Sequence, residues 1–532
     1  MKKFFAIVLS VLMVLSLAAC SGKDNTTESG DKKTDAPKKE WGDTLRVGVD
    51  GEPDSLFAAK QQNKSDNRVN SSLFNYLVEW DDEAKAAKPS LATSWEWVGD
   101  DYTKIRFTLR DDVYFSNGEK MVGEDVTESL RYSCVNHANY TVMFDPDNFV
   151  VEDDTHVLIT LSQPYPNLID CLGCDYYTVF DWSAFKADVD AKGQEKAEAE
   201  WMRNPIGTGP YILKEWKDGD HITLVRNEKY WDKENMPYFA KIEYYFIGDP
   251  AARVSALEAG TIDVSYNLPV KQIAEMESKG LTVNPYEENV AQPLSINMRN
   301  NPALADELVR KAIFYAIDKN ALADAYHQGK GSYSKSPLTG QTSPYYYECE
   351  NFSQDLDVAK AALAEAKAKN GWTDKDLTFT LWHIAGTDKS QVELLQFYLG
   401  EIGITINIEE ADFATVLFEH LFKGDSTIGF GENDLWDTTR MLDLVDNRVP
   451  TSWNAYVGEH EQELYDLIDA AKAASGDARK EAYNKVQQFC ADHYVVTTVD
   501  CVLLPDAWAN GLTGMKYDAH CWPNVWAMHP VD

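Results

Sequence analysis

The chain has 532 residues, a formal net charge of −36 at pH 7 and a hydrophobic fraction of 44%. A chain of this length is expected to form two or three domains rather than one simple core. Its strong negative charge repels phosphate backbones and therefore argues against nucleic acid as a partner. Beyond the first twenty residues, no apolar run approaches the roughly 18 residues of a transmembrane helix.

The first twenty residues have the order of a secretory signal. Two lysines precede a mostly apolar, uncharged run from Phe4 to Ala19, which leads directly into Cys20. This order predicts a signal peptide over residues 1–19. The closing Leu-Ala-Ala-Cys resembles the bacterial lipobox, in which the cysteine becomes the lipidated first residue of the mature protein. An ordinary signal peptide with a chance cysteine is the alternative.

The stretch after Cys20 has the composition of a tether. It is rich in Ser, Lys, Asp, Thr and Gly and has no large apolar residue up to position 40. Such a segment cannot bury a core, and we expect residues 20–40 to form a lipidated, disordered linker. Folded sequence is expected to begin near Trp41.

From Trp41 onward, strand-like and helix-like patterns alternate, which predicts mixed α/β domains. Strands are expected over residues 45–49, 105–109, 156–161, 222–225, 377–382 and 404–408. Helices are expected over residues 123–132, 251–259, 308–317, 358–369 and 389–402. Gly260 and the pair Asn370-Gly371 are typical stops for two of these helices.

Seven cysteines remain after Cys20, which is an odd number. They are Cys134, Cys171, Cys174, Cys349, Cys490, Cys501 and Cys521. One CxxC pair without a second does not make a zinc site, although it is compatible with a redox pair. Buried thiols or one structural disulfide are the main interpretation, and the sequence leaves the pairing open.

Five sequence blocks follow one another along the chain. They are LRVGVDGEPDSL (45–56); PSLATSW (89–95) with FTLRDDVYFSNG (107–118); NPIGTGPY (204–211) with LVRNEKYW (224–231); RVSALEAGTID (253–263); and VRKAIFYAIDK (309–319) with LGEIGI (399–404). In this order, behind a lipobox, they make the chain resemble the extracellular solute-binding proteins of ABC importers. The resemblance is to family 5, which includes the oligopeptide-binding and dipeptide-binding proteins.

The resemblance implies an α/β fold of the two-lobed periplasmic-binding-protein type, class II and large, with an extra inserted domain. Two crossing segments would join the lobes at a hinge, and the ligand would be trapped between them. Lobe one would comprise residues 41–75, 201–289 and 494–532. The inserted domain would span residues 76–200, and lobe two residues 290–493.

A segment of lobe two carries the ligand-binding prediction. In the peptide-binding members, a carboxylate within Gly-Trp-Gly-Ala-Asp-Tyr pairs with the ligand's amino group, and the matching stretch here is residues 429–434. Without gaps the aspartate position falls on Asn433, and with a one-residue shift it falls on Asp434. A buried carboxylate needs a cationic partner, so Asp434 would favour peptides and Asn433 alone a neutral ligand.

Phe430 replaces the usual tryptophan of that segment, and Trp436 and Asp437 follow it. The competing interpretation is a solvated acidic loop. Other candidates for lining the ligand site are two aromatic-rich pairs and two glutamines, although an aromatic side chain is more often part of a core. They are Trp382, His383, Phe397, Tyr398, Gln61 and Gln62.

The sequence thus predicts a monomeric, lipid-anchored receptor on the outer face of a membrane, in a Gram-positive type of bacterium. It would capture a small solute, foremost an oligopeptide, and deliver it to an ABC permease without chemistry, cofactor or resident metal. An oligosaccharide, another polar nutrient, nickel or haem are alternative ligands. An exported hydrolase is the alternative class, but its S-x-x-K at residues 332–335 and S-D-N at residues 65–67 are in the wrong order and lack a KTG element.

Overall fold

The computed structural model of the protein places residues from Trp41 to Asp532 in one compact unit. It describes residues 41–61, 64–81, 86–137, 141, 143–173, 175–327, 333–341, 343–350, 353–385, 389–412, 415–421, 428–430, 433–434, 438–449, 452, 454–518 and 522–531. The predicted signal peptide and tether lie outside these residues, Cys20 included. Among the described residues, no helix combines the length and apolar character needed to cross a bilayer.

A nine-stranded mixed sheet connects segments from across the whole chain. Its order is β15-β12-β17-β11-β1-β10-β9-β8, and β16 pairs with β12 beside β15. Strand β1 (Thr44–Val49) runs parallel to both of its neighbours, and the remaining pairings are antiparallel. The other strands are β8 (Tyr211–Lys217), β9 (His221–Arg226), β10 (Lys241–Phe246), β11 (Val264–Ser265), β12 (Leu281–Ile296), β15 (Ile428–Phe430), β16 (Asn433–Asp434) and β17 (Thr497–Ala509).

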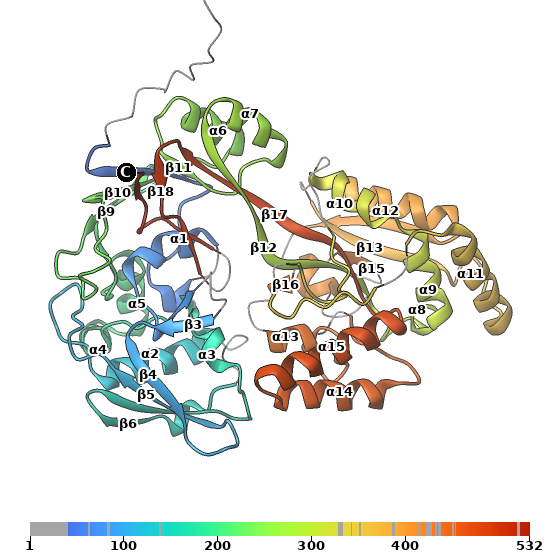
Figure 1. Ribbon diagram of the computed structural model, residues 1–532, viewed down its shortest axis with the longest axis horizontal. Coiled ribbons are helices and arrows are strands. Elements are labelled where there is room, and N and C mark those ends of the chain that lie inside the picture. The colour runs from blue at the N-terminus through green and yellow to red at the C-terminus, as the bar shows by residue number, and fades with distance from the viewer. Residues whose placement is uncertain are drawn as a thin grey trace, which may run out of the picture. The chain divides into compact units, whose positions relative to one another are not determined.

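Strands β12 and β17 are the two crossing segments that the family resemblance implied. They pair along most of their length, from Leu281 opposite Ala509 to Leu294 opposite Thr497. Figure 1 shows them side by side, running from the region of α6 (Pro250–Glu258) and α7 (Ile273–Ser278) to that of β13 (Thr378–Ile384). One end of each strand therefore belongs to one buried core and the other end to another.

The first core forms around β1, whose Leu45, Val47 and Val49 side chains are buried. Helices α1 (Lys64–Leu73), α4 (Trp182–Lys192) and α5 (Gln194–Arg203) belong to this part of the chain. The C-terminal residues return to it through β18 (Leu512–Thr513), β19 (Lys516–Tyr517), β20 (Pro523–Asn524) and β21 (His529–Pro530). A smaller cluster under α6 and α7 adjoins the crossing strands.

A second core lies within the sequence predicted as the inserted domain. Its four-stranded antiparallel sheet has the order β4-β5-β7-β6, and α2 (Gly123–Asn136) packs against β6 and β7. The elements are β2 (Val78–Asp81), β3 (Ala86–Pro89), β4 (Ala92–Trp97), β5 (Lys104–Leu109), β6 (Val150–Asp153), β7 (His156–Thr160) and α3 (Leu168–Cys171). This core has its own buried cluster, from Leu77 to Val179.

The third core, called the lobe-two core below, is built mostly of helices around the parallel pair β13 and β14 (Thr405–Ala411). Its helices are α8 (Pro302–Ala305), α9 (Glu307–Ala316), α10 (Lys319–His327), α11 (Leu356–Asn370), α12 (Ser390–Glu401), α13 (Thr438–Asp443), α14 (Glu461–Ala473) and α15 (Gly476–Asp492). The three cores and the mixed sheets confirm the α/β prediction. The domain boundaries drawn from the sequence stay a prediction.

Local signals in the sequence explain several element ends. Asp355 accepts hydrogen bonds from the backbone N–H groups of Asp357 and Val358, and so caps the N-terminus of α11. Gly371 ends the same helix in the left-handed conformation, at φ 72°. The predicted stop at Asn370-Gly371 is confirmed, and the other predicted strands and helices match observed elements within a few residues.

The glycines of the block NPIGTGPY allow two stretches of backbone to lie unusually close together. Neither Gly207 nor Gly209 has a positive φ. A Cβ atom on Gly207 would lie 2.3 Å from the carbonyl oxygen of Leu73, and one on Gly209 would lie 2.4 Å from the Leu73 carbonyl carbon. These glycines therefore allow the end of α1 to approach the backbone closely.

Candidate functional site

The predicted ligand segment lies against a crossing strand. Asn433 pairs with Ala291 and Asp434 with Val290, where β16 adds to the edge of β12. The next strand, β15, continues the pairing with Phe430 opposite Leu294. On its other side, the β12–β17 ladder has irregularities between Glu287 and Pro293, and such bulges are common beside binding sites. The segment thus sits where β12 enters the lobe-two core.

The side chains of this segment are placed only in part. Phe430 is half-buried and packs against the lobe-two core, as a large apolar anchor would. The structure gives Asn433 and Asp434 as successive residues of β16, but describes only their backbone. Trp436 and Asp437 lie outside the described residues. Which of Asn433 and Asp434 meets a ligand therefore stays a prediction.

Trp382 and His383 lie near the carboxyl end of β13, which runs parallel to β14. In open α/β sheets, ligands bind at the carboxyl ends of the strands. The Trp382 ring stacks on His420 with centroids 3.6 Å apart and an interplanar angle of 5°. His420 belongs to the π-helical turn Thr415–Leu421, labelled η5, a type of turn found often at functional sites. Strand β13 contacts both β15 and η5.

Helix α12 carries two predicted aromatics with different surroundings. Tyr398 packs against the lobe-two core, and burial, with a smaller contribution from Asp318, raises the pKa of its phenol. Phe397 exposes 58% of its surface and meets Tyr398 with ring centroids 5.8 Å apart. The structure therefore brings Tyr398 to the core that carries β15 and leaves Phe397 at the solvent-exposed surface.

A buried polar pair joins α12 to the crossing strand β17. Asp500 is 2% exposed and accepts a hydrogen bond from Nε2 of Gln391, at 3.1 Å. The same amide donates to the carbonyl of Leu322, which links α10 to the pair. Asp500 lies opposite Gln292 in the β12–β17 register. This pair was not predicted from the sequence, although a lone aspartate in the apolar run of residues 495–504 is a usable signal.

Gln61 lies in the part of the chain that packs around β1, and Gln62 lies outside the described residues. The Gln61 side chain is buried, and its Oε1 atom accepts a hydrogen bond from Asn70 at 3.4 Å. Its neighbours Ala58 and Ala59 belong to the first core. Gln61 is thus placed on a different core from the other predicted site residues, and its role as a ligand contact stays a prediction.

In the two motifs considered for hydrolysis, Ser332 and the side chain of Ser65 lie outside the described residues, and the described charged groups have structural partners. Lys335 pairs with Glu348 at 2.7 Å and is half-exposed, which keeps the ammonium group solvated. Asp66 of the S-D-N stretch accepts a hydrogen bond from the backbone of Asp54, at 2.7 Å, and so fixes the turn after β1. Among the described residues, no group of three metal-ligating side chains converges.

Five cysteines lie in the part of the chain that the structure describes, and no disulfide joins any two of them. They are Cys134, Cys171, Cys349, Cys490 and Cys501. Burial raises the pKa of Cys134 to about 11 and that of Cys349 to about 12, so both stay protonated at neutral pH. Cys174 and Cys521 lie outside the described residues.

Comparison with known proteins identifies the family. The model for bacterial extracellular solute-binding proteins, family 5 Middle, matches residues 86–444. The heme-binding protein A of Haemophilus influenzae is 28% identical over 74% of this chain and 74% of its own length. The oligopeptide-binding protein AppA of Bacillus subtilis is 26% identical over 78% of each chain.

A solved structure matches the fold. It is the periplasmic binding protein DppA of Helicobacter pylori in complex with the peptide STSA, with a TM-score of 0.73 and 20% identity over 92% of this chain and 98% of that one. The fold is therefore the predicted two-lobed type. With a family model that spans most of the folded chain, the protein belongs to the bacterial extracellular solute-binding proteins, family 5.

Proposed function

We propose that the protein is a lipid-anchored receptor that captures oligopeptides outside the cell and delivers them to an ABC permease, without catalysing a reaction. Family membership supports capture and delivery, because such proteins bind a small solute and work with ABC permeases. The observation that carries the ligand site is the pairing of Asn433 and Asp434 with β12 at the crossing between lobes. A peptide amino group would meet a carboxylate at this position.

The peptide assignment is supported by relatives whose names specify peptides, namely AppA and DppA. A haem-binding relative of similar identity keeps haem as the second candidate. The stacked Trp382 and His420 rings would suit a flat ligand of that kind, because aromatic planes stack on one another. The two candidates differ in what they require: a peptide needs a carboxylate partner, and haem needs aromatic faces.

A binding screen of the mature protein tests the proposal. We expect alanine peptides of two to five residues to raise the melting temperature, and calorimetry to return a stoichiometry of one. Asp434→Asn should weaken peptide binding by about a hundredfold if Asp434 pairs with the amino group, because a charged hydrogen bond contributes about 3 kcal/mol. Asn433→Ala is the matched variant. A shift with haemin or maltotriose and none with peptides would overturn the assignment.

The lipid anchor is tested separately. Cys20→Ser should release the protein from cells into the medium and abolish labelling by a radioactive or clickable palmitate analogue. A variant in another cysteine, Cys134→Ser, controls for labelling of internal thiols. Retention of Cys20→Ser on the membrane, or unchanged labelling, would contradict lipidation at this residue.

A further inference from the structure

The candidate ligand segment belongs to a loop whose two ends meet at one residue of β12. At the start, Ile428 of β15 lies opposite Ile296. At the end, the backbone N–H of Ile296 donates to Oδ1 of Asn454, at 2.7 Å. We call residues 428–454 the closed loop. It contains β15, β16 and α13, so both of its ends are fastened to the strand on which β16 pairs.

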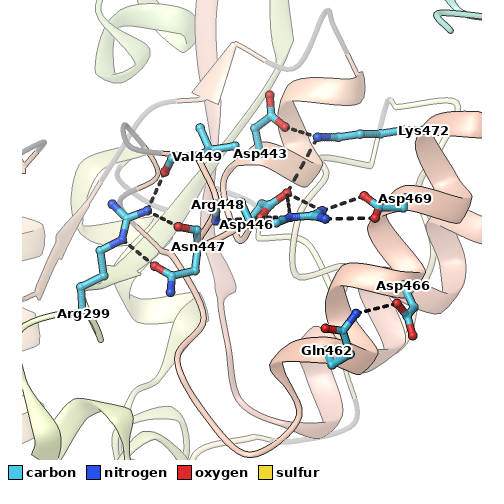
Figure 2. Close-up of polar contacts among 10 residues, drawn as sticks. All are labelled: Arg299, Asp443, Asp446, Asn447, Arg448, Val449, Gln462, Asp466, Asp469 and Lys472. Atoms are coloured by element: carbon cyan, nitrogen blue, oxygen red, sulfur yellow. Dashed lines mark hydrogen bonds and ion pairs between the residues drawn. The ribbon is translucent and has the colours of Figure 1, made fainter. Parts of the chain in front are cut away.

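Arg299 fastens the returning end of the closed loop. It follows β12 by three residues, and its guanidinium binds backbone and amide oxygens. Nε donates to Oδ1 of Asn447 at 2.7 Å, and the terminal nitrogens donate to the carbonyls of Asn447 at 3.1 Å, Val449 at 2.5 Å and Ser452 at 3.1 Å. Figure 2 shows the guanidinium facing Asn447 and Val449. Burial lowers the pKa of Arg299, whereas Tyr465 and Asp446 act in the opposite direction.

A second network fastens the same residues to α14. The guanidinium of Arg448 binds Asp446 and Asp469, with shortest distances of 2.9 Å and 2.7 Å. Lys472 binds Asp443 at 2.6 Å, at the end of α13. In Figure 2, Arg299 lies on one side of Asn447 and this network lies on the other side. Residues 443–449 are therefore held between β12 and α14, and Arg299 supplies the bonds on the β12 side.

We propose that Arg299 is a positioning residue for the ligand site, because it holds the closed loop in the place that presents β16. The inference rests on the proposed function only in taking β16 as the ligand contact. The guanidinium reaches three carbonyl groups and one amide at once because it is planar and carries five donors. A lysine at this position keeps the charge but cannot occupy that fork. Without the bonds from the guanidinium, a longer stretch of the loop is free to move, which raises the entropy of open states.

The chain contains a matched control. Arg310 is more deeply buried than Arg299 and donates to the backbone carbonyls of Leu304, Ala305, His493 and Tyr494, at 2.7 to 3.1 Å, while its guanidinium lies 5.4 Å from the centroid of the Tyr456 ring. It lies in the same core but bonds no residue of the closed loop. Arg310→Lys therefore removes bonds of the same kind whose acceptors all lie outside the closed loop. Asn447→Ala is a milder variant, because it removes only the acceptor of Nε.

Hydrogen exchange of the ligand-free full chain tests the proposal without any ligand. In Arg299→Lys, amides of β15, β16 and α13 should exchange about tenfold faster than in the wild type. Asn447→Ala should give a smaller acceleration of the same amides. Arg310→Lys should accelerate exchange in α8, α9 and the residues after α15, and leave β15 and β16 unchanged. Unchanged exchange of β15 and β16 in Arg299→Lys, with normal or reduced overall stability, would overturn the proposal.

Trialanine binding, measured by calorimetry, connects the device to the ligand. Arg299→Lys should weaken binding more than Arg310→Lys does, although the latter lowers the melting temperature more. Equal effects of the two variants on affinity would reduce Arg299 to a structural role. If neither the wild type nor the variants bind trialanine but the exchange result holds, the peptide assignment fails and the positioning role of Arg299 stands.

Discussion

Two loop regions of the molecule are held by opposite means. The block around Gly207 is fixed inside one part of the structure: the Asn75 amide oxygen accepts bonds from Thr208 and Trp231, both at 3.1 Å, and Asn227 bonds the carbonyl of Gly209 at 3.0 Å. The closed loop 428–454 is instead held at its ends, by Arg299 and Asn454.

The difference separates scaffold from site. In the Gly207 block, backbone approaches backbone so closely that no side chain fits, and buried amides satisfy the turn. In the closed loop, side-chain hydrogen bonds hold the returning end, and β16, which is predicted to meet the ligand, is held by backbone pairing with β12. A segment held through its backbone keeps its side chains available for binding while its position remains defined.

The largest expected effect concerns the scaffold side of this comparison. Gly207→Ala places a methyl group within contact distance of the Leu73 backbone, which cannot move as a flexible side chain would. We expect a loss of about 3 kcal/mol in the free energy of unfolding. Urea unfolding followed by tryptophan fluorescence measures it.

Gly400→Ala, inside α12 with no atom within 4 Å of the added Cβ, should instead stabilise by up to about 1 kcal/mol. A loss below about 1 kcal/mol for Gly207→Ala would break the comparison.

The pH dependence of Asp125 tests the scaffold side a second way. Desolvation foremost, and Asp181 in part, raise the pKa of this buried carboxyl to about 6, although the N–H groups of Val122 and Trp182 favour its charged form. Because the folded-state pKa lies above the unfolded one, the stabilising contribution is complete below about pH 4 and is lost as the pH rises through 6.

Asp125→Asn removes this titration. The stability of the wild type relative to Asp125→Asn should therefore increase by about 2 to 3 kcal/mol between pH 7 and pH 4. Urea unfolding of both proteins across this range gives the difference. A pH-independent difference would show that Asp125 titrates normally.

Asn454→Ala sharpens the other side of the comparison. The substitution leaves the backbone N–H of Ile296 without its acceptor, which lowers the free energy of unfolding. It also removes the buried Nδ2 of Asn454, which has no hydrogen-bond partner in the described structure, and this offsets part of the loss. We expect a loss of about 1 kcal/mol in the free energy of unfolding and faster amide hydrogen exchange in β15. Asn235→Ala, which removes an exposed bond to Asp232, should stay within about 0.5 kcal/mol. Equal losses of stability in Asn454→Ala and Asn235→Ala would contradict a special role for Asn454 at the end of the closed loop.

The smallest effect is expected between the turn that joins β4 to β5 and the turn that joins α14 to α15. Tyr102 Oη lies 3.2 Å from Oγ of Ser475, in the turn between α14 and α15. Tyr102→Phe should cost only a few tenths of a kcal/mol, because both groups are reachable by water. Thermal unfolding measures this, and a loss above about 1.5 kcal/mol would show that the contact is a principal tie.

Short-range features of the fold were predictable from the sequence. The ends of α11 follow from the capping aspartate at 355 and the left-handed glycine at 371, both of which act within one turn. The strand at β1 follows from its apolar alternation. The family blocks added the two-lobed architecture, which no periodicity contains.

The site was predictable only as a segment. The pairing of β16 with Val290 and Ala291 joins residues more than 140 positions apart, and register across such a distance has no local signal. Arg299 was missed because a single arginine after a strand resembles a solvated charge, and only the folded chain brings the carbonyls of residues 447–452 to it. The stacking of Trp382 on His420 was not predictable for the same reason, because the two residues lie on different elements.

The strand order has a consequence for how the chain is made. Strand β17 lies between β11 and β12, so the central sheet stays in two pieces until residues 497–509 arrive. Every pairing that joins the cores through this sheet has a large sequence separation, which slows folding. Synthesis proceeds from the N-terminus, so the chain is nearly complete before this sheet can join the cores. The sheet that joins the cores would then be completed last, after the parts that it connects.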